Sequence, residues 1–255
     1  MTQSSRTAAF FDLDNTRIRG SSLFYLARGL FKLKFFSSKD MWAFIWKQAK
    51  FVVVGKEHIN DMQFIKSVGL RIAAGHSIES LVNIADGVVE QYLVPKVYQQ
   101  TVELAKTHLQ RGEEVWIVTA APNRLANVLA SKLGFTGALG THAEEVDGCF
   151  TGELVGKPLH GPEKAVAIRE LAERTGLDLA GSSAYSDSVY DLPLLQAVGH
   201  PNVVNGDRQL RAIAKKEGWR QYDFRRLRHA RRYGGQTVVA ALAALFMRNR
   251  RNKKG

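Results

Sequence analysis

The chain has 255 residues, and its 36 Lys and Arg against 24 Asp and Glu give a formal net charge of +12. Residues 225–255 contain ten basic residues and no acidic ones, so this tail carries +10 and the preceding 224 residues only +2. That distribution argues against a uniformly basic nucleic-acid-binding protein, and an apolar fraction of 45% excludes disordered and collagen-like classes.

Signals for compartment are few. The single cysteine, Cys149, excludes an intramolecular disulfide framework and a multi-cysteine zinc site. The first residues lack the pattern of a secretory signal peptide, and no apolar run approaches the ~20 residues that a bilayer-spanning helix needs. We therefore expect a cytoplasmic protein.

The first half of the chain predicts one strand followed by helices. Residues 8–13 (AAFFDL) form a short apolar run that is typical of a buried strand. From about residue 21 to 94, apolar side chains recur at helical spacing. A further helix is predicted from Pro95 to Gln110, before the Arg111-Gly112 break.

The second half alternates between strands and helices. Buried strands are predicted at 114–119, 180–186 and 202–204, and helices at 123–133, 162–175 and 210–217. Residues 135–158 are rich in Gly and Thr and predict short strands and turns. Such alternation predicts an α/β fold with a parallel sheet, which the all-helical segment 21–94 interrupts after the first strand. We therefore expect a core of residues 1–20 and 95–224, a helical insertion at 21–94, and a basic and apolar tail at 225–255.

Acidic and hydroxyl residues follow three of the predicted strands. Asp12 and Asp14 follow the first strand, Thr119 ends the second, and Asp187 and Asp191 follow a third. Open parallel sheets bind ligands at the carboxyl ends of their strands, so these side chains are expected to converge. Two carboxylates on one side of a strand end repel each other unless a cation or a proton lies between them.

The order of these motifs resembles the haloacid dehalogenase (HAD) superfamily of aspartate-nucleophile phosphohydrolases. The segments that carry the resemblance are FFDLDNT, IVTAAPN, GPEKAVAIREL and YSDSVYDLPLL, within roughly residues 8–220. The details are most similar to the phosphoserine-phosphatase-like branch, in which a helical type 1 cap follows the first motif. The resemblance implies a HAD-like Rossmannoid core, with segment 21–94 as the cap.

The resemblance also implies a role for each carboxylate. Asp12 would attack phosphorus and form an aspartyl-phosphate, and Asp14 would act as general acid and then as general base. The Asp12 carboxylate, the backbone carbonyl of Asp14 and Asp187 would bind Mg²⁺, which prefers hard oxygen ligands. Asp191 would hold a metal-bound water or orient the lysine of the third motif.

The remaining motif residues would bind the phosphoryl group. Thr119 would donate its hydroxyl, helped by backbone N–H groups of the turn that begins at Ala120. Lys164 would pair with Asp12 and with the phosphoryl oxygens. Thr16 would support the first loop. The predicted activity is therefore Mg²⁺-dependent hydrolysis of a small phosphate monoester.

Two departures from the family pattern concern the substrate. Phosphoserine phosphatases have a glutamate about nine residues after the nucleophile, whereas this chain has Ser21, which cannot supply the charge that an ammonium group needs. Arg17 and Arg19 make this entrance basic instead, which disfavours phosphoserine and suits a second anionic group. Tyr190 replaces an Asn that is common before Asp191; it either narrows the leaving-group pocket or packs.

The tail and the aromatic insertion leave alternatives open. Residues 238–247 (VVAALAALFM) would form a helix of about 15 Å between basic clusters, too short to cross a bilayer. The tail either docks on the core or binds an anionic membrane surface at the inner face of the membrane. The latter suits a membrane-associated phosphatase of a lipid-like phosphate. A non-catalytic membrane or nucleic-acid adaptor is the third alternative; with no nucleic-acid-binding fold in the pattern, nucleic acid is disfavoured as a partner.

Overall fold

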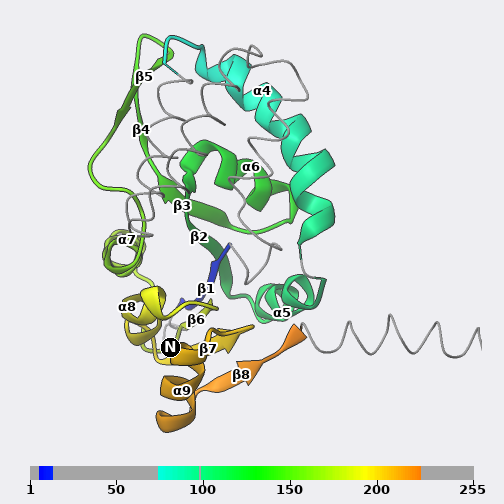
Figure 1. Cartoon of the computed structure of the whole chain (residues 1–255), viewed down its shortest axis with the longest axis vertical. Helices are drawn as coiled ribbons and strands as arrows, with labels where there is room; N and C mark the ends of the chain where they lie inside the picture. Colours follow the sequence, from blue (N-terminus) through cyan, green and yellow to red (C-terminus); the bar gives the residue numbers. More distant parts are fainter. Residues whose placement is uncertain (1–5, 14–73, 98, 225–255) are drawn as a thin grey trace, which may run out of the picture.

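A six-stranded parallel sheet forms the centre of the protein. The computed structural model describes residues 6–13, 74–97 and 99–224, and Figure 1 shows their arrangement. The strand order is β3-β2-β1-β6-β7-β8, with every neighbouring pair parallel. The strands are β1 (Ala8–Asp12), β2 (Glu114–Pro122), β3 (Gly137–Thr141), β6 (Ser183–Ser186), β7 (His200–Val204) and β8 (Arg220–Tyr222). The predicted α/β fold with a parallel sheet is confirmed.

Strand β1 lies in the middle of the sheet and is buried along its whole length. Successive side chains of a strand point to opposite faces, so Phe10 packs in one apolar cluster with Ile168, and Phe11 packs in another with Leu125. Complete burial of such a side chain stabilises the fold by roughly 1.5–3 kcal/mol. The central position of β1 therefore anchors Asp12 at its carboxyl end.

Helices cover both faces of this sheet. The cluster on one face takes side chains from α4 (Ile78–Val88), α5 (Gln99–Gln110) and α6 (Asn123–Lys132). The other cluster takes side chains from α7 (Pro162–Thr175), α8 (Leu192–Gln196) and α9 (Arg208–Lys216). This is the layered architecture that alternating strands and helices predict.

A two-stranded antiparallel hairpin extends from the sheet and pairs with the chain that leads into α4. Its strands are β4 (Ala143–Val146) and β5 (Cys149–Leu154). The Gly75 N–H donates to the Phe150 carbonyl at 2.8 Å, and the Phe150 N–H donates to the His76 carbonyl at 3.1 Å. The carboxyl-terminal end of the predicted insertion thus joins the core by backbone hydrogen bonds.

Helix α4 also packs on the core through α6. Lys132 Nζ lies 3.0 Å from a carboxylate oxygen of Asp86 and 3.0 Å from one of Glu90. Ala85 of α4 belongs to the same apolar cluster as Leu125 of α6. The boundaries of the insertion at 20/21 and 94/95 stay a prediction, because residues 14–73 lie outside the described part of the chain.

Several elements differ from their predicted bounds. Helix α5 begins at Gln99 rather than at Pro95, which lies in a 3₁₀ turn, Val94–Lys96, that follows a π-helical turn, Val89–Leu93. Val97 has extended backbone angles, which interrupt helical hydrogen bonding between that turn and α5. Strand β6 starts at Ser183 rather than at residue 180. Helix α8 and the short edge strand β8 were not predicted.

In the described ranges, no helix has both the length and the apolar character to span a membrane.

Candidate active site

Lys164 occupies the first turn of α7 and is almost completely buried, with 3% of its surface exposed. Gly161 precedes the helix with a positive φ of 56°, which favours glycine, and Pro162 occupies the first helical position, where its missing N–H costs no hydrogen bond. The helix therefore begins abruptly, and the lysine side chain reaches the carboxyl ends of the central strands.

The Lys164 ammonium joins two carboxylates from distant parts of the chain. Its Nζ donates to Asp12 Oδ1 at 2.6 Å and to Asp191 Oδ2 at 2.7 Å. Asp12 ends β1, and Asp191 lies in the 3₁₀ turn Val189–Asp191 after β6. The three predicted residues Asp12, Lys164 and Asp191 therefore meet in one buried cluster.

The charges in this cluster determine its protonation. Burial by itself lowers the pKa of Lys164, but the neighbouring Asp12 and Asp191 carboxylates outweigh that effect and hold this pKa above its usual value. The lysine is consequently an ammonium at neutral pH. Among the described side chains of this cluster, two carboxylates face one ammonium, and such oxygen-rich sites are suited to a divalent cation.

Ser186 completes the support of Asp191 and was missed in the sequence. Its hydroxyl donates to Asp191 Oδ2 at 2.7 Å, and its oxygen accepts from the Ser188 N–H at 3.3 Å. Ser186 is the last residue of β6 and is fully buried. A hydroxyl directly before Asp187, at a strand end, was the available signal in the sequence.

Thr119 lies on β2, beside the end of β1. The register pairs Asp12 with Val118, so Thr119 is the next residue along the neighbouring strand. Thr119 is buried, and its hydroxyl oxygen accepts from the Ala121 N–H at 3.1 Å. Ala120 is half-buried, and its carbonyl accepts from the Thr141 hydroxyl at 2.9 Å. Both predicted phosphate-binding positions are thus at the carboxyl edge of the sheet.

Asp187 follows β6 directly and is partly buried. Its backbone carbonyl accepts from the Asp207 N–H at 2.8 Å. Asp14 and Thr16, the other two predicted site residues, lie outside the described residues. Within the described ranges, no group of three or more acidic, histidine or cysteine side chains is arranged to hold a metal ion. The predicted set of three metal ligands stays a prediction.

Tyr190 is exposed beside this cluster. Its side chain is 64% exposed, and its ring lies 6.0 Å from the ring of His160 at a tilt of 38°. Tyr190 thus lies at the surface with its ring near His160, and both sequence-based interpretations, narrowing of the leaving-group pocket or packing, stay predictions.

The sheet order, the buried lysine and the acids at the strand ends together give an α/β protein whose candidate site lies at the carboxyl edge of a parallel sheet. A family model described as haloacid dehalogenase-like hydrolase matches residues 9–196. The chain therefore belongs to the haloacid dehalogenase-like hydrolase family. Curated relatives of 44% and 35% identity are named as phosphatases, which supports the phosphatase that the motifs predicted.

Curated relatives span most of the chain. A Mycobacterium tuberculosis protein named phosphoserine phosphatase SerB1 is 44% identical over 247 residues, covering 94% of this chain and 80% of the relative. A histidinol-phosphatase from Neisseria meningitidis is 28% identical over 224 residues, covering 86% of this chain and all of the relative.

Solved structures agree on the fold. A Bordetella pertussis protein of unknown function has a TM-score of 0.75 at 28% identity, covering 86% of this chain and 99% of its own. An apo phosphoserine phosphatase has a TM-score of 0.58 at 18% identity, covering 89% of this chain and 98% of its own. The predicted HAD-like core is confirmed.

Proposed function

We propose that this chain hydrolyses a small phosphate monoester in a Mg²⁺-dependent reaction, through an aspartyl-phosphate formed on Asp12. The observation that carries this proposal is the buried bridge of Lys164 between Asp12 and Asp191. A lysine held by two carboxylates at the carboxyl edge of a parallel sheet is suited to fix one nucleophilic oxygen and to receive an anion.

In the first step, a carboxylate oxygen of Asp12 attacks phosphorus. A bond from that oxygen to phosphorus forms, and the bond from phosphorus to the alcohol oxygen breaks. Asp14 gives its proton to the departing alcohol oxygen. In the second step, Asp14 takes a proton from water, whose oxygen attacks phosphorus and releases inorganic phosphate and the Asp12 carboxylate.

In this proposal Lys164 and Thr119 orient the nucleophile and bind the transferred phosphoryl group. The Lys164 ammonium orients Asp12 through its hydrogen bond to Oδ1 and offsets negative charge on the transferred phosphoryl group. Thr119 uses its oxygen as the acceptor for Ala121, so its hydroxyl proton is suited to donation to a phosphoryl oxygen. The Ala120 N–H is proposed as a second donor to that group.

The residues present fit a divalent cation. Asp12 and Asp187 follow adjacent parallel strands, and both supply carboxylate oxygens, the ligands that Mg²⁺ prefers. The excess of carboxylate charge over the Lys164 ammonium also favours a cation. Asp12, Asp187 and the Asp14 carbonyl would hold Mg²⁺, which when bound neutralises charge between nucleophile and phosphate.

The substrate is proposed to be the phosphate ester of a small alcohol. The names of the relatives indicate two such esters, phosphoserine and histidinol phosphate. Ser21 disfavours phosphoserine, because a hydroxyl cannot supply the charge that its ammonium group needs, and Arg17 and Arg19 suit a second anionic group on the substrate. Phosphate release from a panel of these esters and p-nitrophenyl phosphate, with and without EDTA, tests the activity and ranks the substrates. Absence of phosphate release from every ester would contradict the proposal.

A cytoplasmic location with peripheral attachment to the inner face of the membrane is the proposed location. Its support is the sequence of residues 225–255, with ten basic residues and the apolar run 238–247. Flotation of the full chain and of residues 1–224 with anionic and neutral liposomes tests the attachment. Equal partitioning of the two proteins would remove the tail as an anchor.

A further inference from the structure

Asp207, which no motif includes, holds the loop of Asp187 at both ends. Its backbone N–H donates to the Asp187 carbonyl at 2.8 Å, and its Oδ2 accepts from the Val189 N–H at 2.8 Å. The same carboxylate caps α9, because Oδ1 accepts from the Leu210 N–H at 2.7 Å. One residue therefore ties the segment 187–189 to the start of a helix 18 to 20 positions further along the chain.

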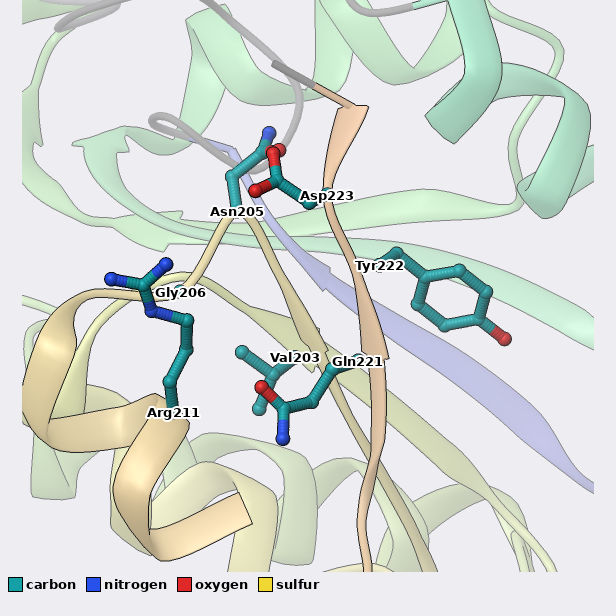
Figure 2. Close-up of a pocket in the computed structure, with 7 residues that line it drawn as sticks. All are labelled: Val203, Asn205, Gly206, Arg211, Gln221, Tyr222 and Asp223. Atoms are coloured by element: carbon teal, nitrogen blue, oxygen red, sulfur yellow. The ribbon is translucent and has the colours of Figure 1, made fainter. Parts of the chain in front are cut away.

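The helix that Asp207 caps is packed into the core. Leu210 and Ala214 of α9 are fully buried in the apolar cluster on that face of the sheet. Gly206, directly before Asp207, lines the same pocket as Val203 and Arg211 (Figure 2). A Cβ at Gly206 would lie 2.4 Å from Val203 Cγ1 and 3.1 Å from Arg211 Cγ. A side chain at this position would require Val203 or Arg211 to shift, so the packing before α9 favours glycine.

We propose that Asp207 is a positioning residue for the metal site, which it serves by holding the backbone directly after the Asp187 side chain at two points, the Asp187 carbonyl and the Val189 N–H. The inference rests on the proposed function, in which Asp187 holds Mg²⁺. Groups that orient a metal ligand typically contribute a factor of about 10–100 in metal affinity. The helix cap alone would contribute stability and leave that affinity unchanged, so the two roles can be separated.

The test uses Asp207→Ser in the full chain. The oxygen of a serine side chain can still accept from the Leu210 N–H, but this side chain is too short to accept from the Val189 N–H as well. The helix therefore keeps its cap, and the loop loses one hydrogen bond. We expect the Mg²⁺ dissociation constant, measured by calorimetry without substrate, to rise about 10-fold or more. The melting temperature of the variant without metal should stay within about 2 °C of the wild-type value. At saturating Mg²⁺, its KM for p-nitrophenyl phosphate should equal that of the wild type.

Two control variants separate the loss of the hydrogen bond between Asp207 and Val189 from general effects of charge and of helix capping. Asp223→Asn removes a carboxylate from the same edge of the sheet, beside Asn205 and Gly206 in Figure 2, and tests for a general effect of charge. Ser77→Ala removes the cap of α4, where Ser77 accepts from the Ser80 N–H at 3.1 Å, and tests for a general effect of cap loss. Both should bind Mg²⁺ as the wild-type chain does.

The outcomes distinguish this inference from the function on which it rests. Wild-type Mg²⁺ affinity in Asp207→Ser, or an equal loss in Asp223→Asn, overturns the role of Asp207 and leaves the proposed function standing. A wild-type chain that neither binds Mg²⁺ nor releases phosphate overturns the proposed function instead. If Asp207→Ser does not fold, Asp207→Asn takes its place, and its Mg²⁺ affinity is judged by the same criteria. The single amide oxygen of asparagine can replace only one of the two contacts that the carboxylate accepts.

Discussion

The Lys164 ammonium lies 2.6 Å from Asp12 Oδ1, although 152 residues separate the two in the chain. Both side chains are almost fully buried, and Asp191 is the third member of the group. Breaking a buried ion pair by removing one partner typically costs about 3–5 kcal/mol, because it leaves an uncompensated charge. The stability of the fold and the charge of the site are therefore linked through one lysine.

Lys164→Met tests that link. We expect a loss of about 3–5 kcal/mol in the free energy of unfolding at pH 7, since two carboxylates lose their ammonium partner. Phosphate release should fall at least ~100-fold, as for other losses of a charge that stabilises the transition state. Urea denaturation and a steady-state assay measure the two effects. Lys157→Met is the matched control, because Lys157 is exposed and pairs with Glu163 at the surface.

The pH dependence of the unfolding free energy, compared between wild type and Lys164→Met, gives a second prediction. The pKa of Lys164 is raised in the fold, so its stabilisation is complete below the unfolded pKa of about 10.4 and is lost as the pH rises through the higher folded value. The difference in unfolding free energy between wild type and Lys164→Met should be constant from pH 7 to about 10 and narrow above that. Burial also raises the pKa of Tyr185, but that residue is present in both proteins and cancels in the difference. A constant difference up to pH 12 would contradict this assignment.

Removal of the buried Tyr185 hydroxyl is predicted to lower the stability of the fold and to leave kcat nearly unchanged. His108 Nε2 lies 2.8 Å from this hydroxyl, and His108 Nδ1 lies 2.6 Å from Glu113 Oε2. Tyr185→Phe should cost about 1–3 kcal/mol, because it leaves a buried imidazole nitrogen without its partner. The phenylalanine ring should keep the stack on Phe11, so kcat should change less than about twofold. Thermal unfolding checks the first value, and Tyr222→Phe at a half-buried position is the control.

Two glycines should respond in opposite directions to alanine. A Cβ at Gly199 would lie 1.8 Å from the Ala180 carbonyl oxygen, a backbone atom that cannot rotate away, so Gly199→Ala should cost at least the ~1–3 kcal/mol of ordinary overpacking. Gly87 lies inside α4, and a Cβ there would meet no side chain or neighbouring segment of the described residues within 4 Å. Gly87→Ala should therefore stabilise the protein by about 0.5–1 kcal/mol. Equal effects in a chemical denaturation series would contradict the packing described at Gly199.

The sequence predicts best where local signals coincide. Helix α7 begins and ends at its predicted residues, because Gly161, Pro162 and Gly176 mark its ends. Pro95 gave the same kind of signal at α5, but the extended Val97 separates its turn from the helix. Strand β8 has only three residues and largely exposed side chains, so it lacks the apolar pattern by which strands are found.

The residues of the candidate site also fall into two groups, those that the sequence predicts and those that it does not. Asp12, Lys164 and Asp191 were predicted because each stands in a motif, and motif order determines which strand ends they reach. Ser186 stands in the fourth motif, but its bond to Asp191 was missed, because motif order does not give side-chain partners within a loop. Asp207 stands outside the motifs, and its contacts depend on loop geometry that no periodic pattern encodes. Such hydrogen bonds between segments become visible only when the backbone is known.

The most direct test of the account is to identify the phosphorylated residue. A single turnover with ³²P-labelled substrate, quenched in acid, should leave label on the peptide that contains Asp12, and borohydride reduction should convert that residue to homoserine. Asp12→Asn should carry no label, while Asp178→Asn, in the turn after α7 and remote from the motifs, should be labelled like the wild type. Full phosphatase activity in Asp12→Asn, or label on another residue, would contradict the assignment of Asp12 as the nucleophile.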